Sequence, residues 1–361
     1  MECYPSISRR TAMQQLALGV GSLSLLPAWS REKPRMGVAL VGLGNYANLA
    51  LAPALLETKY CRLTGLVSGD RAKAEAWAKT YEVPFSNLYS YETFDQIADN
   101  EEIDIVYVVL PNAMHAEYSI RAAEAGKHVI CEKPMAISSE ECAAMIAACK
   151  KAGTRLSIGY RLHFEPHHRE VMRLGQQQVF GPLHLIETSF GYRFRNLSSW
   201  RLDPVLGGGG AIMDLGVYCI QAARYVSGQE PISVQAQAFT YDREVFQGIH
   251  ESLTWQFEFS GDVMAHTFTS YSTYVDRLYG SAEKGWFECN PAFNGAGSQG
   301  RTQDGPMDFP KVNQQALQMD EFVRAIREDR PSPVSGEEGG KDLKLVEAIV
   351  EAAESGRKIA L

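Results

Sequence analysis

Two segments far apart in the chain carry side chains suited to proton transfer. In "VICEKPMA" an apolar run ends at Glu132 and Lys133, and in "GGGGAIMDLGVY" Asp214 and Tyr218 stand four residues apart. At that spacing on a helix both side chains share one face and can meet one ligand. A lysine beside a tyrosine favours the phenolate, which can accept the proton of an alcohol while hydride leaves its carbon. Lys133, Asp214 and Tyr218 therefore predict proton transfer coupled to hydride transfer, although a structural Lys-Pro turn would also explain the first segment alone.

A glycine motif near the start of the chain predicts a nucleotide site. In "VGLGNYANLALAP", Gly42, Gly44 and Ala47 form the pattern G-x-G-x-x-A directly after an apolar run. The first glycine permits a tight turn, the second lets a pyrophosphate approach the backbone, and the small third residue lets a helix pack on the strand. The motif is weakly specific by itself, but the strand and helix patterns that follow it favour a dinucleotide over a structural glycine turn.

The end of the next apolar run, "LVSGDRAKA", bears on the choice between NAD and NADP. An NAD site usually places an acidic residue there for the ribose 2′-hydroxyl group. Here Ser68 ends the run, and Arg71 and Lys73 follow closely. A hydroxyl group and nearby cations suit a 2′-phosphate, whereas Asp70 would suit NAD. The balance favours NADP, with NAD as the less favoured cofactor.

Regular alternation of strand and helix patterns covers about 36–160 and must position these residues. Helical patterns at 70–80, 115–126 and 138–152 separate the apolar runs "MGVALVGLG", "CRLTGLVS", "IDIVYVVL", "KHVICEKP" and "RLSIGY". Such alternation is typical of βαβ units and predicts a Rossmann domain with a doubly wound parallel sheet over 31–160. Ligands bind at the carboxyl ends of such strands, so Glu132 and Lys133 should face the nicotinamide end.

The pattern changes after this region. Alternating β-branched and aromatic residues predict an open, mostly antiparallel sheet flanked by helices over 161–361, a substrate and oligomerisation domain whose C-terminal helix packs back on the first domain. We expect strands at 182–192, 231–241, 252–260, 262–272 and 276–289, and helices at 166–175, about 210–227, 314–328 and 337–356. The sheet face with "LTWQFEF" and "MAHTFTSY" is expected to be apolar and to form a homodimer or homotetramer.

Composition excludes some classes of partner. The 361 residues carry a net charge of −8, and no basic run stands in the body of the chain, so nucleic acid is not an expected partner. The seven cysteines show no CxxC spacing, so we expect no zinc or other metal. Cys142 and Cys149 are expected to be small core residues, and the odd count favours a protein that folds with reduced thiols.

The N-terminus resembles an export signal. Ser8-Arg9-Arg10-Thr11 precedes a weakly hydrophobic stretch, and residues 13–28 are too short and too rich in glycine and serine for membrane insertion. Residues 1–30 thus resemble a twin-arginine signal, which exports folded proteins to the bacterial periplasm. The alternative is a chance arginine pair before an apolar helix in a cytoplasmic protein.

Several motifs together resemble one known family. "GLGNYA", "LPNAMHAE", "AGKHVICEKPMA", "IGYRLHFEP" and "GGGGAIMDLGVY" are similar to the glucose–fructose oxidoreductase/inositol dehydrogenase family over about 36–240, and within it to the periplasmic glucose–fructose and aldose–aldose oxidoreductases. The resemblance makes Lys133 catalytic and assigns the carboxylate to Asp214. Tyr218 stands where many relatives have histidine, and Asn45 where the nearest relatives often have a basic residue. Ser68 and Lys73 match the residues that contact the 2′-phosphate.

The resemblance also implies the residues around the cofactor and the sugar. Cofactor contacts extend to Asn45, Tyr46, Pro111, Asn112, His115, Glu132, Arg161, Trp200 and Arg201, and sugar contacts to Tyr160, His163, Arg201, Asp214 and Tyr218. His167 and His168 are expected on a solvated face. Loops such as 291–306 would select the sugar.

The function implied by the resemblance is NADP-dependent oxidation of an aldose at C1 to a lactone. The cofactor would stay bound and be re-oxidised by reduction of a second sugar. One alternative is an ordinary NAD(P)-dependent sugar or cyclitol dehydrogenase that exchanges its cofactor. Another is a non-catalytic sensor of nucleotides or sugars, since a fold alone does not establish chemistry.

Overall fold

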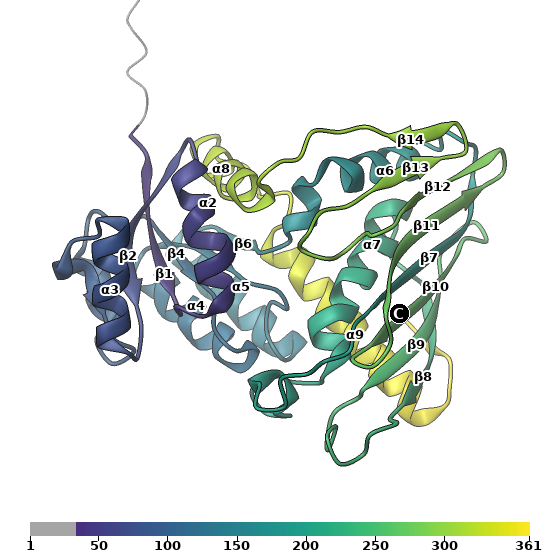
Figure 1. Cartoon of the computed structure of the whole chain (residues 1–361), viewed down its shortest axis with the longest axis horizontal. Coiled ribbons are helices and arrows are strands. Elements are labelled where there is room, and N and C mark those ends of the chain that lie inside the picture. The colour runs from purple at the N-terminus through teal and green to yellow at the C-terminus, as the bar shows by residue number, and fades with distance from the viewer. Residues whose placement is uncertain (1–33) are drawn as a thin grey trace, which may run out of the picture. The chain divides into compact units, whose positions relative to one another are not determined.

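The first sheet has six parallel strands in the order β3-β2-β1-β4-β5-β6 (Figure 1). The computed structural model describes residues 34–361, so the expected signal segment 1–30 lies outside the described residues. The strand order reverses between β1 and β4, which is where a doubly wound sheet opens a crevice for a ligand. The strands are β1 Met36–Val41, β2 Cys61–Val67, β3 Leu88–Tyr89, β4 Ile105–Val108, β5 His128–Cys131 and β6 Leu156–Ile158. The sequence predicted every strand except the short β3.

Helices on the two faces of this sheet begin and end at recognisable caps. In α3 (Arg71–Tyr81) the Asp70 side chain accepts a hydrogen bond from the Lys73 amide, and in α5 (Ser139–Ala152) Ser138 does the same for Glu141. Gly153 ends α5 with a left-handed backbone, φ 70°, which glycine adopts without strain. The other helices here are α2 Ala52–Glu57 and α4 His115–Glu124, and a π-helical turn at Ala47–Leu51 precedes α2.

One face of this sheet is covered by a helix from near the end of the chain. Helix α8 (Gln314–Arg327) contributes Met319, Phe322 and Val323 to the core that contains Val38 and Leu40 of β1. It lies beside α2 (Figure 1). The Asp320 carboxylate accepts hydrogen bonds from two backbone amides that precede β2. The core beneath the first sheet is therefore completed by a helix that follows strands β7–β14 of the second sheet in sequence.

The second sheet has nine strands in the order β14-β13-β12-β11-β7-β10-β9-β8-β15, antiparallel except for the pair β7 and β10. Helices α6 (Pro166–Gln176), α7 (Val217–Ser227) and α9 (Gly336–Ser355) cover one face of it (Figure 1). The predicted fold class is thereby confirmed. The strands are β7 Leu183–Gly191, β8 Ser233–Phe239, β9 Ser252–Glu258, β10 Met264–Ser270, β11 Val275–Ala282, β12 Gly285–Cys289, β13 Gly300–Thr302, β14 Gly305–Met307 and β15 Ile359–Ala360.

The open face of this sheet differs from the expectation of an apolar surface. Trp255 and Phe257 of β9 are buried under the helices, while the alternating Gln256 and Glu258 are exposed. Period-two alternation sends the large apolar side chains of "LTWQFEF" inward, so most of that segment's apolar surface is already covered. Met264 of β10 remains partly exposed on the open face.

Two further observations concern the described residues as a whole. The cysteines in residues 34–361 are all buried, and the predicted core positions of Cys142 and Cys149 are confirmed. Within the same residues no helix is both long enough and apolar enough to span a bilayer.

Candidate active site

A cavity of about 740 Å³ lies at the carboxyl ends of the first sheet's strands. Its wall also includes the start of the helix that carries Asp214 and Tyr218. Most of the site residues predicted from the sequence line this one cavity: Gly42, Gly44, Asn45, Tyr46, Ser68, Lys73, Pro111, Asn112, His115, Glu132, Lys133, Arg161, Trp200, Arg201, Asp214 and Tyr218. The structure thus brings both chemical segments of the sequence to the same place.

Lys133 and Asp214 are in direct contact across the cavity. The Lys133 Nζ donates to the Asp214 backbone carbonyl oxygen at 2.7 Å and lies 3.2 Å from its Oδ1. Lys133 follows β5, whereas Asp214 lies in a π-helical turn at Ile212–Gly216 that leads into α7. Such π-helical turns are often found at functional sites. In this turn, the Asp214 backbone carbonyl oxygen is the acceptor that Lys133 binds.

The Asp214 carboxylate is held ionised by its neighbours. Burial favours the neutral acid, but Lys133 and Arg201 outweigh it, and the pKa of Asp214 is lowered to about 2. Arg201 Nε lies 3.3 Å from Oδ1, and the hydroxyl groups of Tyr271 and Tyr192 donate to Oδ2 at 3.3 and 3.4 Å. At neutral pH Asp214 is therefore a fixed anion that orients the lysine, and it is not a proton carrier.

Tyr218 has a cation near its ring on two sides. The Lys133 Nζ is 4.7 Å from the ring centroid, and the Arg161 guanidinium carbon is 5.4 Å from it. Burial lowers the pKa of the Arg161 guanidinium, but the neighbouring Tyr218, Tyr46 and Glu132 outweigh it and the pKa is raised. The tyrosine that the sequence assigned to proton transfer therefore lies beside two cations.

Glu132 is a buried support of the site. Its Oε1 accepts a hydrogen bond from the Tyr107 hydroxyl group at 2.7 Å, and Gln318 Nε2 donates to the same hydroxyl at 3.1 Å. Burial raises the pKa of Glu132 to about 6 against the opposing effects of Tyr107 and Lys133. Any Cβ at Gly159 would lie 2.5 Å from Oε1, so the glycine makes room for this carboxylate.

The glycine turn after β1 fits a dinucleotide. Gly42 has φ 96°, and a Cβ there would lie 2.7 Å from the Val109 carbonyl oxygen, so only glycine is accommodated. At Gly44 a Cβ would meet no heavy atom within 4 Å, which shows open space where a pyrophosphate could approach. Ala47, the first residue of the π-helical turn, is fully buried and does not line the cavity, as its predicted packing role requires.

The residues predicted to contact the adenosine ribose lie at the end of β2 and the start of α3. Ser68 Oγ accepts a hydrogen bond from the Asp70 amide at 3.1 Å, and an Asp70 carboxylate oxygen accepts one from the Lys73 amide at 3.0 Å. Asp70 therefore serves as the N-cap of α3. Ser68, Asp70 and Lys73 all line the cavity, so a phosphate there would meet a hydroxyl group and an ammonium group.

His115 and Asn112 mainly brace the wall of the cavity. The ring nitrogens of His115 bond to the carbonyl oxygens of Pro134 and Leu110 at 2.8 and 2.9 Å, and burial lowers its pKa. Asn112 Nδ2 donates to the Gly207 carbonyl oxygen at 2.8 Å. These contacts fix the peptide after Lys133 and tie the first sheet to the glycine-rich segment before Asp214.

Four aromatic or histidine positions differ from the sequence predictions. Tyr160 and His163 were expected to contact the sugar, but neither lines the cavity. Tyr160 is buried, and the partly buried His163 packs edge-on against Tyr225. His167 and His168 were expected on a solvated face, yet both are buried. His168 bonds to the Ala292 carbonyl oxygen, because α6 packs beneath the loop after β12.

Sequence reasoning missed several residues of the cavity. Tyr192 lines the cavity and bonds to Asp214 from the end of β7, and Tyr271 bonds to Asp214 from the end of β10 without lining the cavity. Phe293 and Asn294 line the cavity from the loop expected to select the sugar. Asp276 holds that loop, because its carboxylate accepts hydrogen bonds from the backbone amides of Phe293 and Asn294. The aromatic run "FGYRF" was the available signal for Tyr192.

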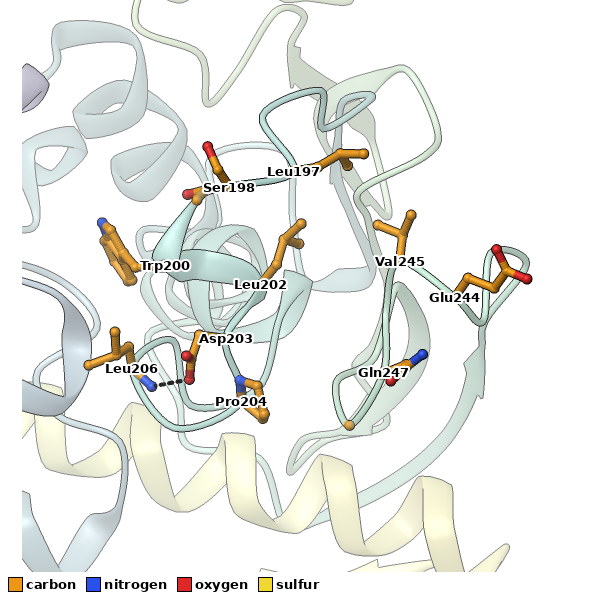
Figure 2. Close-up of a pocket in the computed structure, with 12 residues that line it drawn as sticks. Leu197, Ser198, Trp200, Leu202, Asp203, Pro204, Leu206, Glu244, Val245 and Gln247 are labelled. Carbon is orange, nitrogen blue, oxygen red and sulfur yellow. Dashed lines mark hydrogen bonds between the residues drawn. The ribbon is translucent and has the colours of Figure 1, made fainter.

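A second, more open cavity of about 960 Å³ adjoins the first (Figure 2). It lies between the segments 197–206 and 244–248, and Figure 2 shows Leu202 and Val245 on its two sides. Asp203 accepts hydrogen bonds from the amides of Val205 and Leu206, which shapes this wall. Both cavities are lined by Ser198, Ser199 and Trp200.

Fold and site together define a dinucleotide-dependent oxidoreductase. Residues 36–160 match the oxidoreductase family model for an NAD-binding Rossmann fold, 168–289 match the GFO/IDH/MocA C-terminal domain, and 291–361 match the oxidoreductase family C-terminal alpha/beta domain. The chain belongs to the GFO/IDH/MocA family of NAD(P)-dependent oxidoreductases. Within residues 34–361 no cluster of three or more histidine, cysteine or acidic side chains could hold a metal ion.

Known proteins resemble the chain over most of its length. An aldose-aldose oxidoreductase from Caulobacter crescentus, solved with glycerol, is 40% identical with a TM-score of 0.88, covering 91% of this chain and 100% of that one. D-xylose 1-dehydrogenase [NADP(+)] from Haloarcula marismortui is 28% identical over 90% of this chain and 92% of its own. A D-xylose 1-dehydrogenase (NADP(+)) from Haloferax volcanii is 28% identical over 90% and 100%.

Proposed function

We propose that the protein is an NADP-dependent sugar oxidoreductase that oxidises an aldose at C1 to a lactone. The observation that carries the proposal is the convergence of Lys133, Asp214 and Tyr218 in a cavity with a dinucleotide turn. The similarity to an aldose-aldose oxidoreductase and to NADP-dependent xylose dehydrogenases supports an aldose as substrate.

Residues of this chain can accept the proton that the sugar hydroxyl group loses. As the C1 hydroxyl group of the aldose becomes a carbonyl group, its proton passes to the Tyr218 oxygen and the C1–H bond gives up a hydride. The bound nicotinamide supplies the acceptor for that hydride and its electron pair. Lys133 and Arg161 stabilise negative charge on Tyr218 before the transfer, and Asp214 holds Lys133 in place.

We further propose that the cofactor stays bound and is re-oxidised by a second sugar, whose carbonyl group receives the hydride while Tyr218 returns the proton.

The test is to purify the protein without added nucleotide, identify bound nucleotide by native mass spectrometry, and add glucose. Appearance of reduced-nicotinamide absorbance, reversed by a second sugar, supports the proposal. A protein that arrives without nucleotide and oxidises glucose only with soluble NADP is instead a dehydrogenase that exchanges its cofactor. Absence of any sugar oxidation would favour a sensor.

We also propose a cellular location for the enzyme. The Arg9-Arg10 pair directs export to the periplasm, and replacing both arginines with lysine should retain the protein in the cytoplasm on cell fractionation.

A further proposal concerns the oligomeric state. The protein forms a homodimer or homotetramer through the open face of the second sheet, where Met264 is partly exposed. Light scattering that compares the mass of the Met264→Glu variant with that of the parent protein tests the proposal of assembly. We expect a lower mass for the variant, and an unchanged mass would contradict the proposal.

A further inference from the structure

The first two turns of α8 contact three residues of the active site or its support. Gln314 Oε1 accepts a hydrogen bond from Arg161 Nη1 at 2.7 Å, and Gln315 Nε2 donates to the Tyr46 hydroxyl group at 3.1 Å. Gln318 reaches the Tyr107 hydroxyl group that supports Glu132. Asn313 fixes where the helix begins, because its side chain accepts from the Ala316 amide. The helix that covers the first sheet thus also determines how its active-site side chains lie.

Arg161 differs from the other cations of the cavity in its partners. Lys133 and Arg201 both form ion pairs with Asp214. The buried Arg161 guanidinium instead donates to Gln314 and, through Nη2, to the Phe293 carbonyl oxygen at 2.5 Å. Both acceptors are neutral, and within residues 34–361 no carboxylate forms an ion pair with Arg161. Its charged neighbour Glu132 raises the pKa of the guanidinium without forming an ion pair with it, and the guanidinium lies against the Tyr218 ring.

We infer that Gln314 is a positioning residue that holds Arg161 beside Tyr218 through an acceptor without charge, so that the guanidinium stabilises the phenolate. The inference rests on the proposed function, in which Tyr218 takes the proton. A carboxylate at position 314 would hold the guanidinium equally well and would offset its charge. An amide holds the side chain and leaves the charge available, which is the property that a cation supporting proton removal needs.

Several groups besides Arg161 act on the Tyr218 oxygen. Lys133 follows β5, Tyr46 lies in the glycine turn, Tyr192 follows β7, and Asp214 precedes Tyr218 by one helical turn. None of these contacts Gln314 in the described residues, so a charge introduced at position 314 reaches Tyr218 chiefly through Arg161.

The test compares Gln314→Glu with the parent protein, loaded with its cofactor, in the oxidation of glucose. The variant should have kcat lower by about tenfold or more, with KM changed less than about threefold, because the lost stabilisation acts on the proton transfer. The matched control is Gln177→Glu, which adds the same charge at the exposed end of α6 and should retain the parent rate. Thermal unfolding of the variant checks that its fold is intact.

A second measurement does not depend on activity. Ultraviolet tyrosinate absorbance is followed against pH for the parent and for Gln314→Glu, each minus its own Tyr218→Phe partner. We expect the phenolate signal of this residue to form at higher pH in Gln314→Glu than in the parent. An unchanged signal in a folded variant would overturn the inference, whether or not the protein oxidises sugars. Failure of the parent to oxidise any aldose would instead remove the proposed function, and the absorbance titration would still decide the role of Gln314.

Discussion

The amino group of Lys133 binds Asp214 twice, once at the backbone carbonyl oxygen and once at the carboxylate. Lys133 is fixed by a strand of the first sheet and Asp214 by a helical turn packed on the second. A small relative movement of the two sheets would break both contacts. The ion pair therefore forms only when the nucleotide side and the substrate side of the cavity are correctly placed relative to each other.

Replacing Lys133 with methionine should lower kcat for aldose oxidation by about a hundredfold or more, because Tyr218 loses its nearest cation and Asp214 loses one of its two cationic partners. Single-turnover measurement of reduced nicotinamide isolates the affected step. The exposed Lys150→Met on α5 serves as the control and should leave the rate unchanged. Equal rates for the parent and Lys133→Met would exclude the lysine from the chemistry.

Tyr218→Phe should reduce kcat by about a hundredfold or more, since general acid–base groups contribute at least that much. The ring packs against Phe190 and Phe293, and phenylalanine preserves those contacts, so the unfolding temperature should change little. Cofactor retention, read by mass spectrometry, should also be preserved. Full activity in this variant would require another proton acceptor.

Ser68→Asp should change the cofactor preference. A carboxylate at the end of β2 would repel a 2′-phosphate and accept a hydrogen bond from a 2′-hydroxyl group, so the ratio of NADP to NAD affinity should fall by about tenfold or more. Isothermal titration of stripped protein with each nucleotide measures the ratio. A variant that keeps the parent preference would show that the phosphate does not lie beside this residue.

Glu132→Gln tests the pH dependence of stability. Burial raises the pKa of Glu132 in the folded protein to about 6 from 4.5, so the folded state binds more protons than the unfolded state between these values. The stability of the parent relative to the variant is therefore highest below pH 4.5 and falls, by about 2 kcal/mol in total, as pH rises through 6. Urea unfolding of both proteins at several pH values checks this. A difference in stability that is constant with pH would contradict it.

Much of the active site could be predicted from the sequence, because the ends of the predicted strands show which residues lie at the ligand-binding edge of the sheet. Lys133 follows an apolar run and Asp214 opens a helical pattern, and parallel strands bring their carboxyl ends to one edge of a sheet. The same reasoning could not place Tyr160 or His163, since the side chains after β6 divide between the cavity and the core. Arg161 lines the cavity, while the flanking residues Tyr160 and Leu162 pack into the core.

Other features depend on contacts that no local pattern contains. His168 is buried only because the loop after β12, more than a hundred residues later, covers it. Gln314 reaches Arg161 across a separation of 153 residues. The helix containing Gln314 was predicted at 314–328, but no local pattern in its sequence indicates a partner as distant as Arg161. Such contacts arise from the packing of whole elements and become visible only in three dimensions.

Because of the position of α8, we do not expect the first domain of this enzyme to fold as a separate fragment. A fragment that ends after β6 would contain every residue of the glycine turn but would leave the apolar side chains of β1 without Met319, Phe322 and Val323. We expect such a fragment to aggregate when expressed alone. During synthesis we likewise expect the nucleotide-binding half to reach its final form only after the ribosome has made α8, which ends at residue 327 of 361, so that its affinity for the cofactor is acquired late.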